Sequence, residues 1–301
     1  MNKWHWLLLA LSFWMAAGYA VCGPRRDQQN DDPPLSHQVN RIVSMAPDLT
    51  EILFALGLEE KIVGVTLFSD YPAAAREITK VGSFWQPNIE ATIAAAPDLV
   101  ITKTTTGFDQ QKHLAMRLHR IGYNSLTFHF ETVAELFEAI ENIGRATDSQ
   151  SEVKRLIRDL RTKLNKLSAL VRTGDQVKVL YVVQRQPLRV AGRDTFINEM
   201  IELAGGENAI GPTVHRYPPI GAEQVIGSGA EVIIEPAMMQ NNMAEQKLAA
   251  MEYWSRFSNL PAVQKERIYV IKGDTVSRLG PRLYEGTEAI ARCLKPHLFE
   301  N

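Results

Sequence analysis

The sequence predicts an α/β protein with two Rossmann-like lobes, each built on a parallel sheet, and one long α-helix that joins them. Three observations predict this fold. A short unit of helix, acid and apolar strand occurs at residues 90–101 and again at residues 223–234, and the two copies align without a gap. Strand and helix patterns alternate in both halves of the chain, which is typical of parallel sheets covered by helices. A single long amphipathic segment separates the two halves.

The first lobe is predicted to span residues 41–148 and to open with a strand at residues 41–45. Pro47 suits the first position of the next helix, and Asp48 and Glu51 favour its positive end. Gly57 ends this helix. Besides the repeated unit, the lobe is expected to contain strands at residues 62–66 and 125–128 and helices at residues 110–121 and 133–146.

The connecting helix is predicted at residues 149–173. No Pro or Gly occurs from Ser149 to Val171, apolar residues keep a helical spacing, and Lys and Arg fill the other faces. Since βα units lie on both sides, this helix is expected to connect the lobes. We expect it to be rigid, because a helix kinks only where a cause such as Pro is present.

The second lobe is predicted at residues 174–301. The glycine-rich stretch Gly205–Gly211 follows a helix rather than a strand, so it is interpreted as a helix stop and turn instead of a cofactor loop. The lobe is expected to contain strands at residues 177–183 and 268–271 and helices at residues 195–204, 245–257 and 282–294, in addition to the second copy of the repeated unit.

The first 22 residues are predicted to be a signal peptide. Lys3 precedes an apolar run that ends in small residues and Cys22, which is the pattern of an exported protein. Three outcomes stay open: cleavage after the small residues, lipidation of Cys22, or an uncleaved N-terminal anchor. Residues 23–40 are polar and are expected to form a disordered tether. We therefore expect the protein in the periplasm or at the outer face of the cytoplasmic membrane.

Composition excludes several classes of function. The chain has 301 residues, 45% of them hydrophobic, and a net charge of −1, which does not favour nucleic acid as a partner. Its two cysteines, Cys22 and Cys293, do not make a disulfide framework, and Cys293 lies in a helical pattern that predicts a small core residue. The sequence contains no catalytic, cofactor-binding or metal-binding motif. We expect neither an enzyme nor a bound metal or cofactor.

Aromatic residues at loop positions indicate a ligand site. Phe68 and Tyr71 follow a predicted strand, Trp85 precedes the first repeated unit, and Tyr217 precedes the second. Loops after the carboxyl ends of strands form the binding crevice of an α/β lobe, and aromatic side chains there suit a large, flat, partly apolar ligand. The alternative is that Phe68 and Trp85 cap the core.

Two charged residues follow the last predicted strand, on the same side of the sheet. Asp274 and Arg278 are expected to contribute to the ligand site. Alternatively, they belong to a surface turn.

Five segments in this order resemble the periplasmic substrate-binding proteins of the iron-siderophore and cobalamin class, whose two lobes are linked by a single helix. The segments are Arg41–Glu51, Val65–Pro72, Ala96–Ile101, Leu203–Asn208 and Gly280–Gly286. The stretches at residues 69–72 and 84–86 are most similar to the vitamin B12-binding branch. The resemblance covers nearly the whole chain after the tether.

The resemblance implies that cobalamin, or a related corrinoid, is the ligand. It implies that Phe68, Trp85 and Tyr217 line the corrinoid cleft and that Asp274 accepts hydrogen bonds from the ligand, with Arg278 nearby. A ferric siderophore or haem stays an alternative. Positive charges at Lys103, Arg189 and Arg278 would suit such an anionic chelate, and Phe68 stands where a tyrosine is common.

The resemblance also implies a role for the first residue of each repeated unit. Glu90 and Glu223 resemble the two lobe-tip acids that dock onto arginines of a dimeric ABC permease, which works with its ATPase. Two carboxylates, one on each lobe, can pair with a two-fold arrangement of guanidinium groups. Alternatively, each glutamate only favours the N-terminus of its helix. The binding protein itself is expected to be a monomer.

Overall fold

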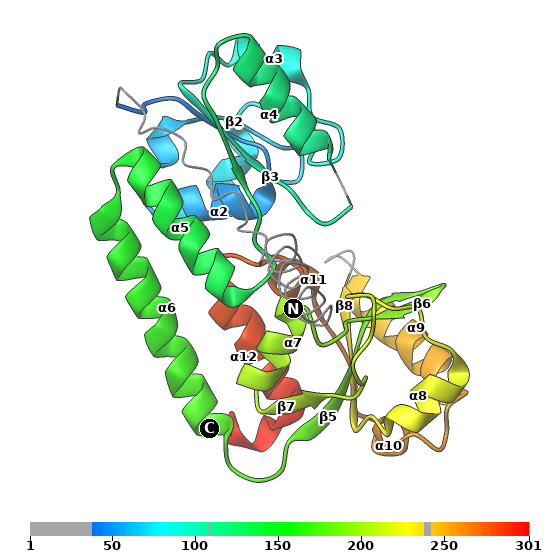
Figure 1. Ribbon diagram of the computed structural model, residues 1–301. Coiled ribbons are helices and arrows are strands. Elements are labelled where there is room, and N and C mark those ends of the chain that lie inside the picture. Colours follow the sequence, from blue (N-terminus) through cyan, green and yellow to red (C-terminus); the bar gives the residue numbers. More distant parts are fainter. Residues whose placement is uncertain (1–37, 108, 238–241, 301) are drawn as a thin grey trace, which may run out of the picture. The chain divides into compact units, whose positions relative to one another are not determined.

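The computed structural model describes residues 38–107, 109–237 and 242–300 (Figure 1). The predicted signal peptide, Cys22 and most of the tether lie outside the described residues. Within the described ranges, no helix combines the length and the apolar character that a membrane crossing requires.

The first lobe contains a parallel sheet with the strand order β2-β1-β3-β4. Each element predicted for this lobe is present within a few residues of the expected position. Its strands are β1 (Ile42–Ser44), β2 (Ile62–Val65), β3 (Leu99–Lys103) and β4 (Ser125–Phe128), and its helices are α2 (Pro47–Ala55), α3 (Ile89–Ala94), α4 (Gln110–Arg120) and α5 (Val133–Thr147), with short 3-10 turns η1 (Glu59–Lys61) and η2 (Ala73–Glu77).

Local sequence explains where the helices of this lobe begin and end. Pro47 starts α2, and the left-handed φ of +72° at Gly57 turns the chain after it. Thr132 and Glu135 form a capping box at the start of α5, with reciprocal hydrogen bonds to each other's backbone. The capping box thus fixes the loop that precedes α5.

The connecting helix is α6 (Gln150–Val171), as predicted. Its apolar stripe is buried, and the stripe packs against α5 of the first lobe and against α7 and α12 of the second. Figure 1 shows α6 running alongside α5. One helix therefore contributes to the packing of both lobes. The buried residues of the stripe are Val153, Ile157, Leu160, Leu164, Leu167 and Val171.

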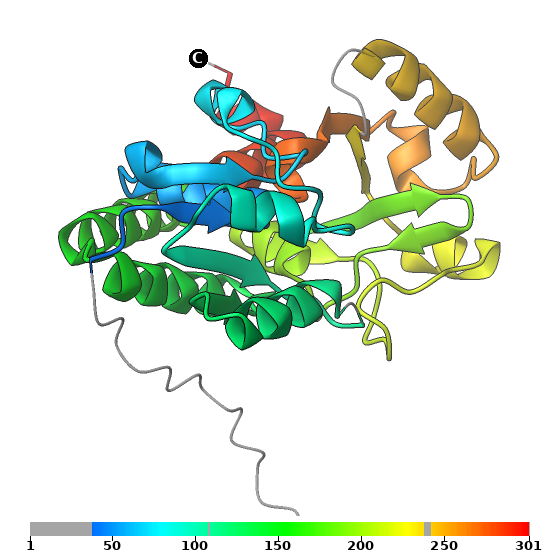
Figure 2. The same cartoon turned by 90° about the horizontal axis from the view of Figure 1, so that it is seen from above.

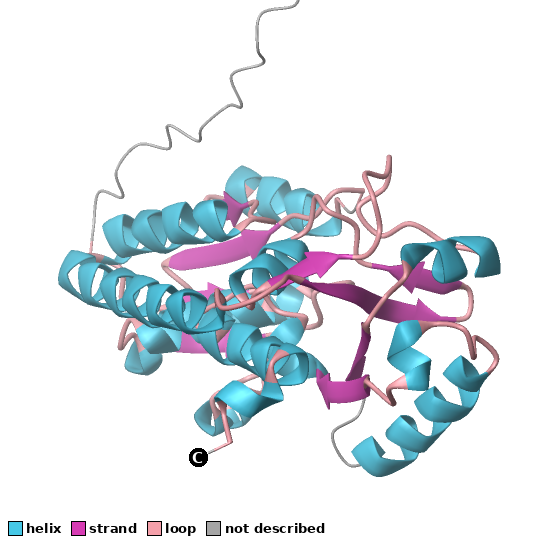
Figure 3. Cartoon of the chain, turned by 90° about the horizontal axis from the view of Figure 1, so that it is seen from below, coloured by secondary structure: helices cyan, strands magenta, loops and turns pink. Residues whose placement is uncertain are grey.

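The second lobe contains a sheet with the order β6-β5-β8-β9, and β7 also pairs with β5. Figures 2 and 3 show the strands of the chain enclosed by helices. The strands are β5 (Val177–Arg185), β6 (Leu188–Val190), β7 (Gly206–Asn208), β8 (Val232–Ala237) and β9 (Ile268–Lys272), and the helices are α7 (Phe196–Leu203), α8 (Ala222–Ser228), α9 (Met243–Ser255), α10 (Pro261–Gln264), α11 (Gly273–Val276) and α12 (Leu283–Leu294), followed by the short turn η4 (Pro296–Leu298).

Two short strands of this lobe differ from the sequence prediction. β6 pairs antiparallel with β5 at one edge of an otherwise parallel sheet. β7 begins at Gly206, where only a turn was predicted. A Cβ at Gly206 would lie 2.7 Å from a methyl group of Leu294, so a larger residue there would require the Leu294 side chain to move. Three residues with two polar side chains carry no period-2 apolar pattern, which explains why the sequence did not indicate this strand.

Both copies of the repeated unit fold as predicted, into a short helix followed by an inner strand. The first copy forms α3 and β3, and β3 lies between β1 and β4. The second forms α8 and β8, and β8 lies between β5 and β9. Cys293 is 6% exposed, which confirms that it is a core residue.

Candidate ligand-binding site

Two loops that carry predicted ligand residues lie side by side at the carboxyl end of the first sheet. The first, called here the aromatic loop, comprises residues 66–72 after β2. The second comprises residues 82–87. Val81 donates its amide proton to the carbonyl oxygen of Val65 over 2.9 Å, and Leu67 donates to Gly82 over 2.9 Å. This short parallel pairing places the Trp85 loop beside the aromatic loop.

Three aromatic side chains of these loops remain open to solvent. The exposed fractions are 59% for Phe68, 45% for Tyr71 and 58% for Trp85. Phe84 contacts Trp85 edge to face, with 5.0 Å between ring centroids. Exposed fractions this large do not fit the alternative in which Phe68 and Trp85 cap the core. We call these three exposed residues, which lie on neighbouring loops of the first lobe, the aromatic surface.

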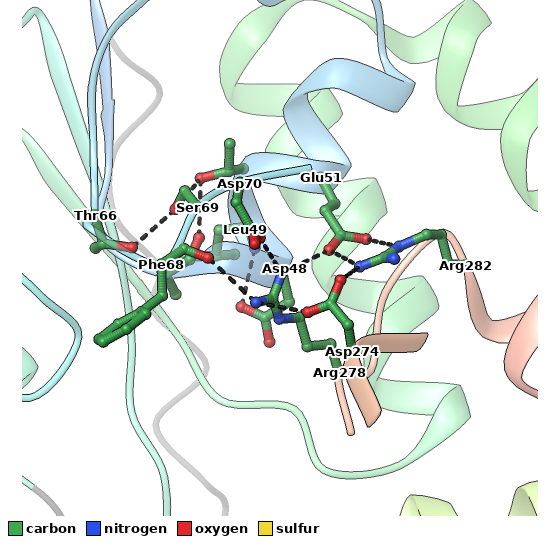
Figure 4. Close-up of polar contacts among 12 residues, drawn as sticks. Asp48, Leu49, Glu51, Thr66, Phe68, Ser69, Asp70, Asp274, Arg278 and Arg282 are labelled. Carbon is green, nitrogen blue, oxygen red and sulfur yellow. Dashed lines mark hydrogen bonds and ion pairs between the residues drawn. The ribbon is translucent and has the colours of Figure 1, made fainter. Parts of the chain in front are cut away.

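Hydrogen bonds between buried hydroxyl groups hold the aromatic loop against the first lobe. Ser69 is 1% exposed, and its side-chain oxygen lies 2.8 Å from that of Thr66 and 3.1 Å from that of Thr50. Thr50 also donates to the Ser44 hydroxyl over 2.9 Å or to the Ala46 carbonyl over 3.1 Å. These bonds attach Ser69 to β1 and α2, while the neighbouring Phe68 ring points away from them (Figure 4).

Arg278 of the second lobe holds the same loop from the opposite side. Its guanidinium group donates to the Phe68 carbonyl oxygen over 3.2 Å and to the Asp70 carboxylate over 3.1 Å. It also contacts Asp274 at 2.7 Å and Glu51 at 3.4 Å. Figure 4 shows Arg278 lying between the aromatic loop and Asp274. Both terminal nitrogens of the predicted ligand residue Arg278 are therefore already bonded to other residues of the protein.

Arg282 completes this cluster. It donates from Nε and Nη2 to the two carboxylate oxygens of Glu51, over 2.8 and 2.5 Å, and it contacts Asp274 at 2.8 Å. Such two-point contacts are the strongest type of arginine–carboxylate pair. The Tyr71 ring stacks on the Arg282 guanidinium group at 4.0 Å. We call the five charged residues Glu51, Asp70, Asp274, Arg278 and Arg282 the arginine network.

Burial controls protonation within the arginine network. Glu51 is 4% exposed, and burial raises the pKa of its carboxyl group, against the opposing effect of Arg282 and Arg278. Burial works to lower the pKa of Arg282, but hydrogen bonds and charges from Glu51 and Asp274 raise it above its ordinary value. Arg282 therefore stays charged, whereas burial disfavours ionisation of Glu51.

Lys103 does not supply a free positive charge, contrary to the sequence expectation. Its side chain pairs with the Asp48 carboxylate and lies 3.6 Å from the centroid of the Phe130 ring. Lys103 is only 8% exposed. At the end of an apolar strand its charge is buried, and Asp48 compensates it at the start of α2.

Tyr217 lies on the second lobe, in a segment that runs beside β6. Arg189 of β6 donates to the Tyr217 carbonyl oxygen over 3.1 Å. The Tyr217 side chain is half-buried, and burial raises the pKa of its hydroxyl group. The neighbouring Arg216 pairs with Glu131, which follows β4 of the first lobe. Tyr217 thus lies next to a second ionic contact between the lobes.

Glu90 and Glu223 occupy equivalent positions on α3 and α8, and both are exposed. In each case the glutamate lies in the first turn, where it also favours the positive end of the helix. Asn88 caps α3 with its side chain, whereas Gln224 bonds back to the Gly221 amide at the start of α8. Both carboxylates are therefore accessible to a partner.

Sequence reasoning missed Glu51, Asp70 and Arg282 as members of the site. Glu51 was interpreted as a helix-end charge, but it binds two arginines more than two hundred residues away in the sequence. The available signals were the segments that carry the family resemblance, since one contains Glu51, one Asp70 and one Arg282. Pairing between these segments was not visible without the fold.

Comparisons with known proteins agree with this architecture. The chain is 29% identical to a vitamin B12-binding protein of Vibrio parahaemolyticus. The match extends over 250 residues and covers 81% of this chain and 85% of that protein. It is 29% identical over 279 residues to an uncharacterized ABC transporter substrate-binding lipoprotein of Bacillus subtilis, covering 91% of this chain and 86% of that protein.

A solved structure shows the same fold. The periplasmic vitamin B12 binding protein BtuF of Vibrio cholerae superposes with a TM-score of 0.72 at 26% identity, covering 87% of this chain and 99% of that chain. A family profile described as periplasmic binding protein matches residues 42–275, well over half of the chain. The family match, together with the two lobes, their parallel sheets and the connecting helix, shows that the chain belongs to the periplasmic binding protein family.

Proposed function

We propose that this protein binds cobalamin or a related corrinoid outside the cytoplasm and delivers it to an ABC import permease and its ATPase. The observation that carries the proposal is the exposed aromatic surface of Phe68, Tyr71 and Trp85. A corrinoid ring is large, flat and partly apolar, and aromatic side chains contact such a ligand over a wide area. The named vitamin B12-binding relatives support the same ligand.

The charges around the aromatic surface favour a ligand without a large net charge. Arg278 and Arg282 face three carboxylates within the arginine network, so the network carries no surplus positive charge when all its acids are ionised. Lys103 is paired with Asp48. An anionic ligand would therefore find neither Lys103 nor Arg278 free to pair with it.

Haem or a ferric siderophore is the second candidate within the same class. One observation favours it: Arg189 is exposed and donates to a backbone carbonyl, and it forms no ion pair with any residue that the structure describes. An anionic chelate could pair with this guanidinium group. Phe68, however, has no hydroxyl group to offer a haem iron.

A competition experiment separates these ligands. Purified protein is incubated with aquocobalamin, a ferric catecholate or haemin, then desalted and scanned for visible absorbance. We expect the corrinoid spectrum alone to be retained in a one-to-one ratio. Retention of haemin or the ferric chelate, with no corrinoid, would reject cobalamin as ligand and preserve the transport class. Retention of none of the three would reject the proposal.

We further propose that Glu90 and Glu223 dock onto arginines of a two-fold symmetric permease, one glutamate from each lobe. Their equivalent, exposed positions on α3 and α8 support this proposal, because a guanidinium group pairs well with an accessible carboxylate. Neither glutamate belongs to the aromatic surface or the arginine network. Ligand binding and docking should therefore be separable by mutation.

A further inference from the structure

The aromatic loop is joined to the second lobe by three different kinds of contact. Arg278 binds the loop's backbone at Phe68 and its carboxylate at Asp70. Arg282 stacks under the Tyr71 ring. Three of the loop's seven residues are therefore in contact with two arginines from a distant part of the chain, and two of these three carry the exposed aromatic rings.

The two arginines are themselves fixed by carboxylates, Asp274, which is partly buried, and Glu51, which is buried. Asp274 contacts both of them, at 2.7 and 2.8 Å. Glu51 projects from α2 of the first lobe and binds Arg282 through both carboxylate oxygens. An arginine held in this way loses its rotational freedom, so the direction in which it presents its remaining donors is set before any ligand arrives.

From this geometry we propose that Arg278 and Arg282 are positioning residues. They hold the aromatic loop so that Phe68 and Tyr71 present their rings to the ligand, and Glu51 and Asp274 anchor the arginines. The contact between the lobes thus determines the shape of the aromatic surface. This positioning role differs from the direct ligand contact that the sequence predicts for Asp274 and Arg278, and its effect on affinity rests on the proposed ligand site.

Hydrogen exchange on ligand-free protein tests the positioning role independently of any ligand. Asp70→Asn removes the loop's carboxylate at a half-exposed side chain, and Arg278→Met removes the arginine that spans the lobes. The reporters are the amides of Leu67 and Ser69, which bond to Gly82 and Thr66. We expect both variants to exchange at these amides about tenfold faster, the scale of losing charge-assisted bonds.

Two controls isolate the loop. The amide of Asn88, which bonds to the carbonyl oxygen of Val81 over 3.2 Å across the base of the 82–87 loop, should exchange at the wild-type rate in both variants. Arg292→Met breaks an exposed ion pair with Glu288 on α12 and should leave the loop amides unchanged. Unchanged exchange at Leu67 and Ser69 in both Asp70→Asn and Arg278→Met would overturn the proposal, and a uniform increase at all amides would reduce Arg278 to a general stabilising residue.

Affinity measurements then connect the loop to the ligand. With aquocobalamin as the probe, we expect Arg278→Met and Asp70→Asn to weaken binding about tenfold, and Arg278→Lys to recover part of the loss because it restores one charge opposite Asp70. A loss of affinity in Arg278→Met without faster exchange would mean that Arg278 touches the ligand directly, and the positioning role would be wrong. Failure of the wild type to bind aquocobalamin would reject the proposed ligand, whereas the exchange result would still decide whether the loop is held as proposed.

Discussion

The two lobes share an architecture but contribute different chemistry to the site. The first lobe presents exposed aromatic rings on loops that follow its strands, with Phe68 and Trp85 each more than half exposed. The second lobe contributes Arg278 and Arg282, whose charges are already matched by carboxylates. The difference indicates a division of roles. In the proposed site, the first lobe offers contact area to a ligand and the second holds that area in place.

The same comparison at the repeated units shows less divergence. α3 and α8 both place a glutamate in the first turn and both leave it exposed. Different side chains accept the hydrogen bonds of the backbone amides at the two helix starts. A docking surface for a symmetric partner has to stay alike on the two lobes, whereas a ligand without two-fold symmetry allows the two sides of its cleft to diverge.

Removal of an arginine from the second lobe should have the largest effect. Arg282→Met leaves Glu51, which is 4% exposed, without its two-point partner. Loss of one partner from a buried pair costs about 3–5 kcal/mol, and we expect a loss of this size in the free energy of unfolding, measured by urea denaturation. Arg292→Met, on the same helix but in an exposed pair, should cost less than about 1 kcal/mol. Equal losses in the two variants would contradict a structural role specific to the second lobe's buried arginine.

Charge reversal at the lobe tips should abolish delivery but leave binding intact. Glu90→Arg and Glu223→Arg each replace an attractive contact by a repulsive one, with a penalty of about 2–5 kcal/mol if the contact is desolvated on docking. We expect each change to lower ligand uptake in cells carrying the cognate importer, and the double variant to lower it further. Ligand affinity, measured by calorimetry, should stay at the wild-type value. Normal uptake by the double variant would leave these glutamates as helix-end charges.

Truncation of an aromatic residue on the first lobe should weaken ligand binding and leave the fold unaffected. Trp85→Ala should reduce the binding free energy of cobalamin by about 1–3 kcal/mol, the scale of losing a large apolar contact in an interface. Because Trp85 is 58% exposed, stability should change little. Leu248→Ala, which truncates a 68% exposed side chain on α9, serves as control. It should change neither the ligand affinity measured by calorimetry nor the stability measured by denaturation. An unchanged affinity in Trp85→Ala would remove this residue from the ligand surface.

The fold and the loop positions of the exposed aromatic residues could be predicted from sequence, because their signals are local. Apolar periodicity indicated α6, and the order of strands and turns placed Phe68 and Trp85 on loops at one edge of the sheet. The arginine network could not be predicted. It joins Glu51 to Arg282 across 231 positions, and no period or motif in the sequence links them. The ion pairs that Asp274 and Arg278 form within the protein were likewise not visible in the sequence, and direct contact of these two residues with a ligand stays a prediction.

A titration of Glu51 gives the smallest effect and the sharpest view of the network. When Glu51 is ionised, the arginine network contains three negative and two positive charges. When Glu51 is protonated, the charges of the network balance. Burial accordingly raises the pKa of Glu51 in the folded protein above the ordinary 4.5. A raised pKa means that the folded state favours the protonated form. The stabilising contribution is complete below the unfolded-state pKa and is lost as the pH rises through the folded-state pKa.

Glu51→Gln removes this titration while keeping the shape of the side chain. The free energy of unfolding of the wild type, relative to this variant, should therefore fall as the pH rises from about 4.5 through the folded pKa, by about 1.4 kcal/mol for each pH unit that separates the two pKa values. Urea denaturation of both proteins across this range measures the difference. If the wild type instead gained stability over Glu51→Gln as the pH rose, attraction to Arg282 would outweigh burial. The second lobe would then hold the first chiefly by charge, and the arginine network would be a source of net stability rather than a means of fixing geometry.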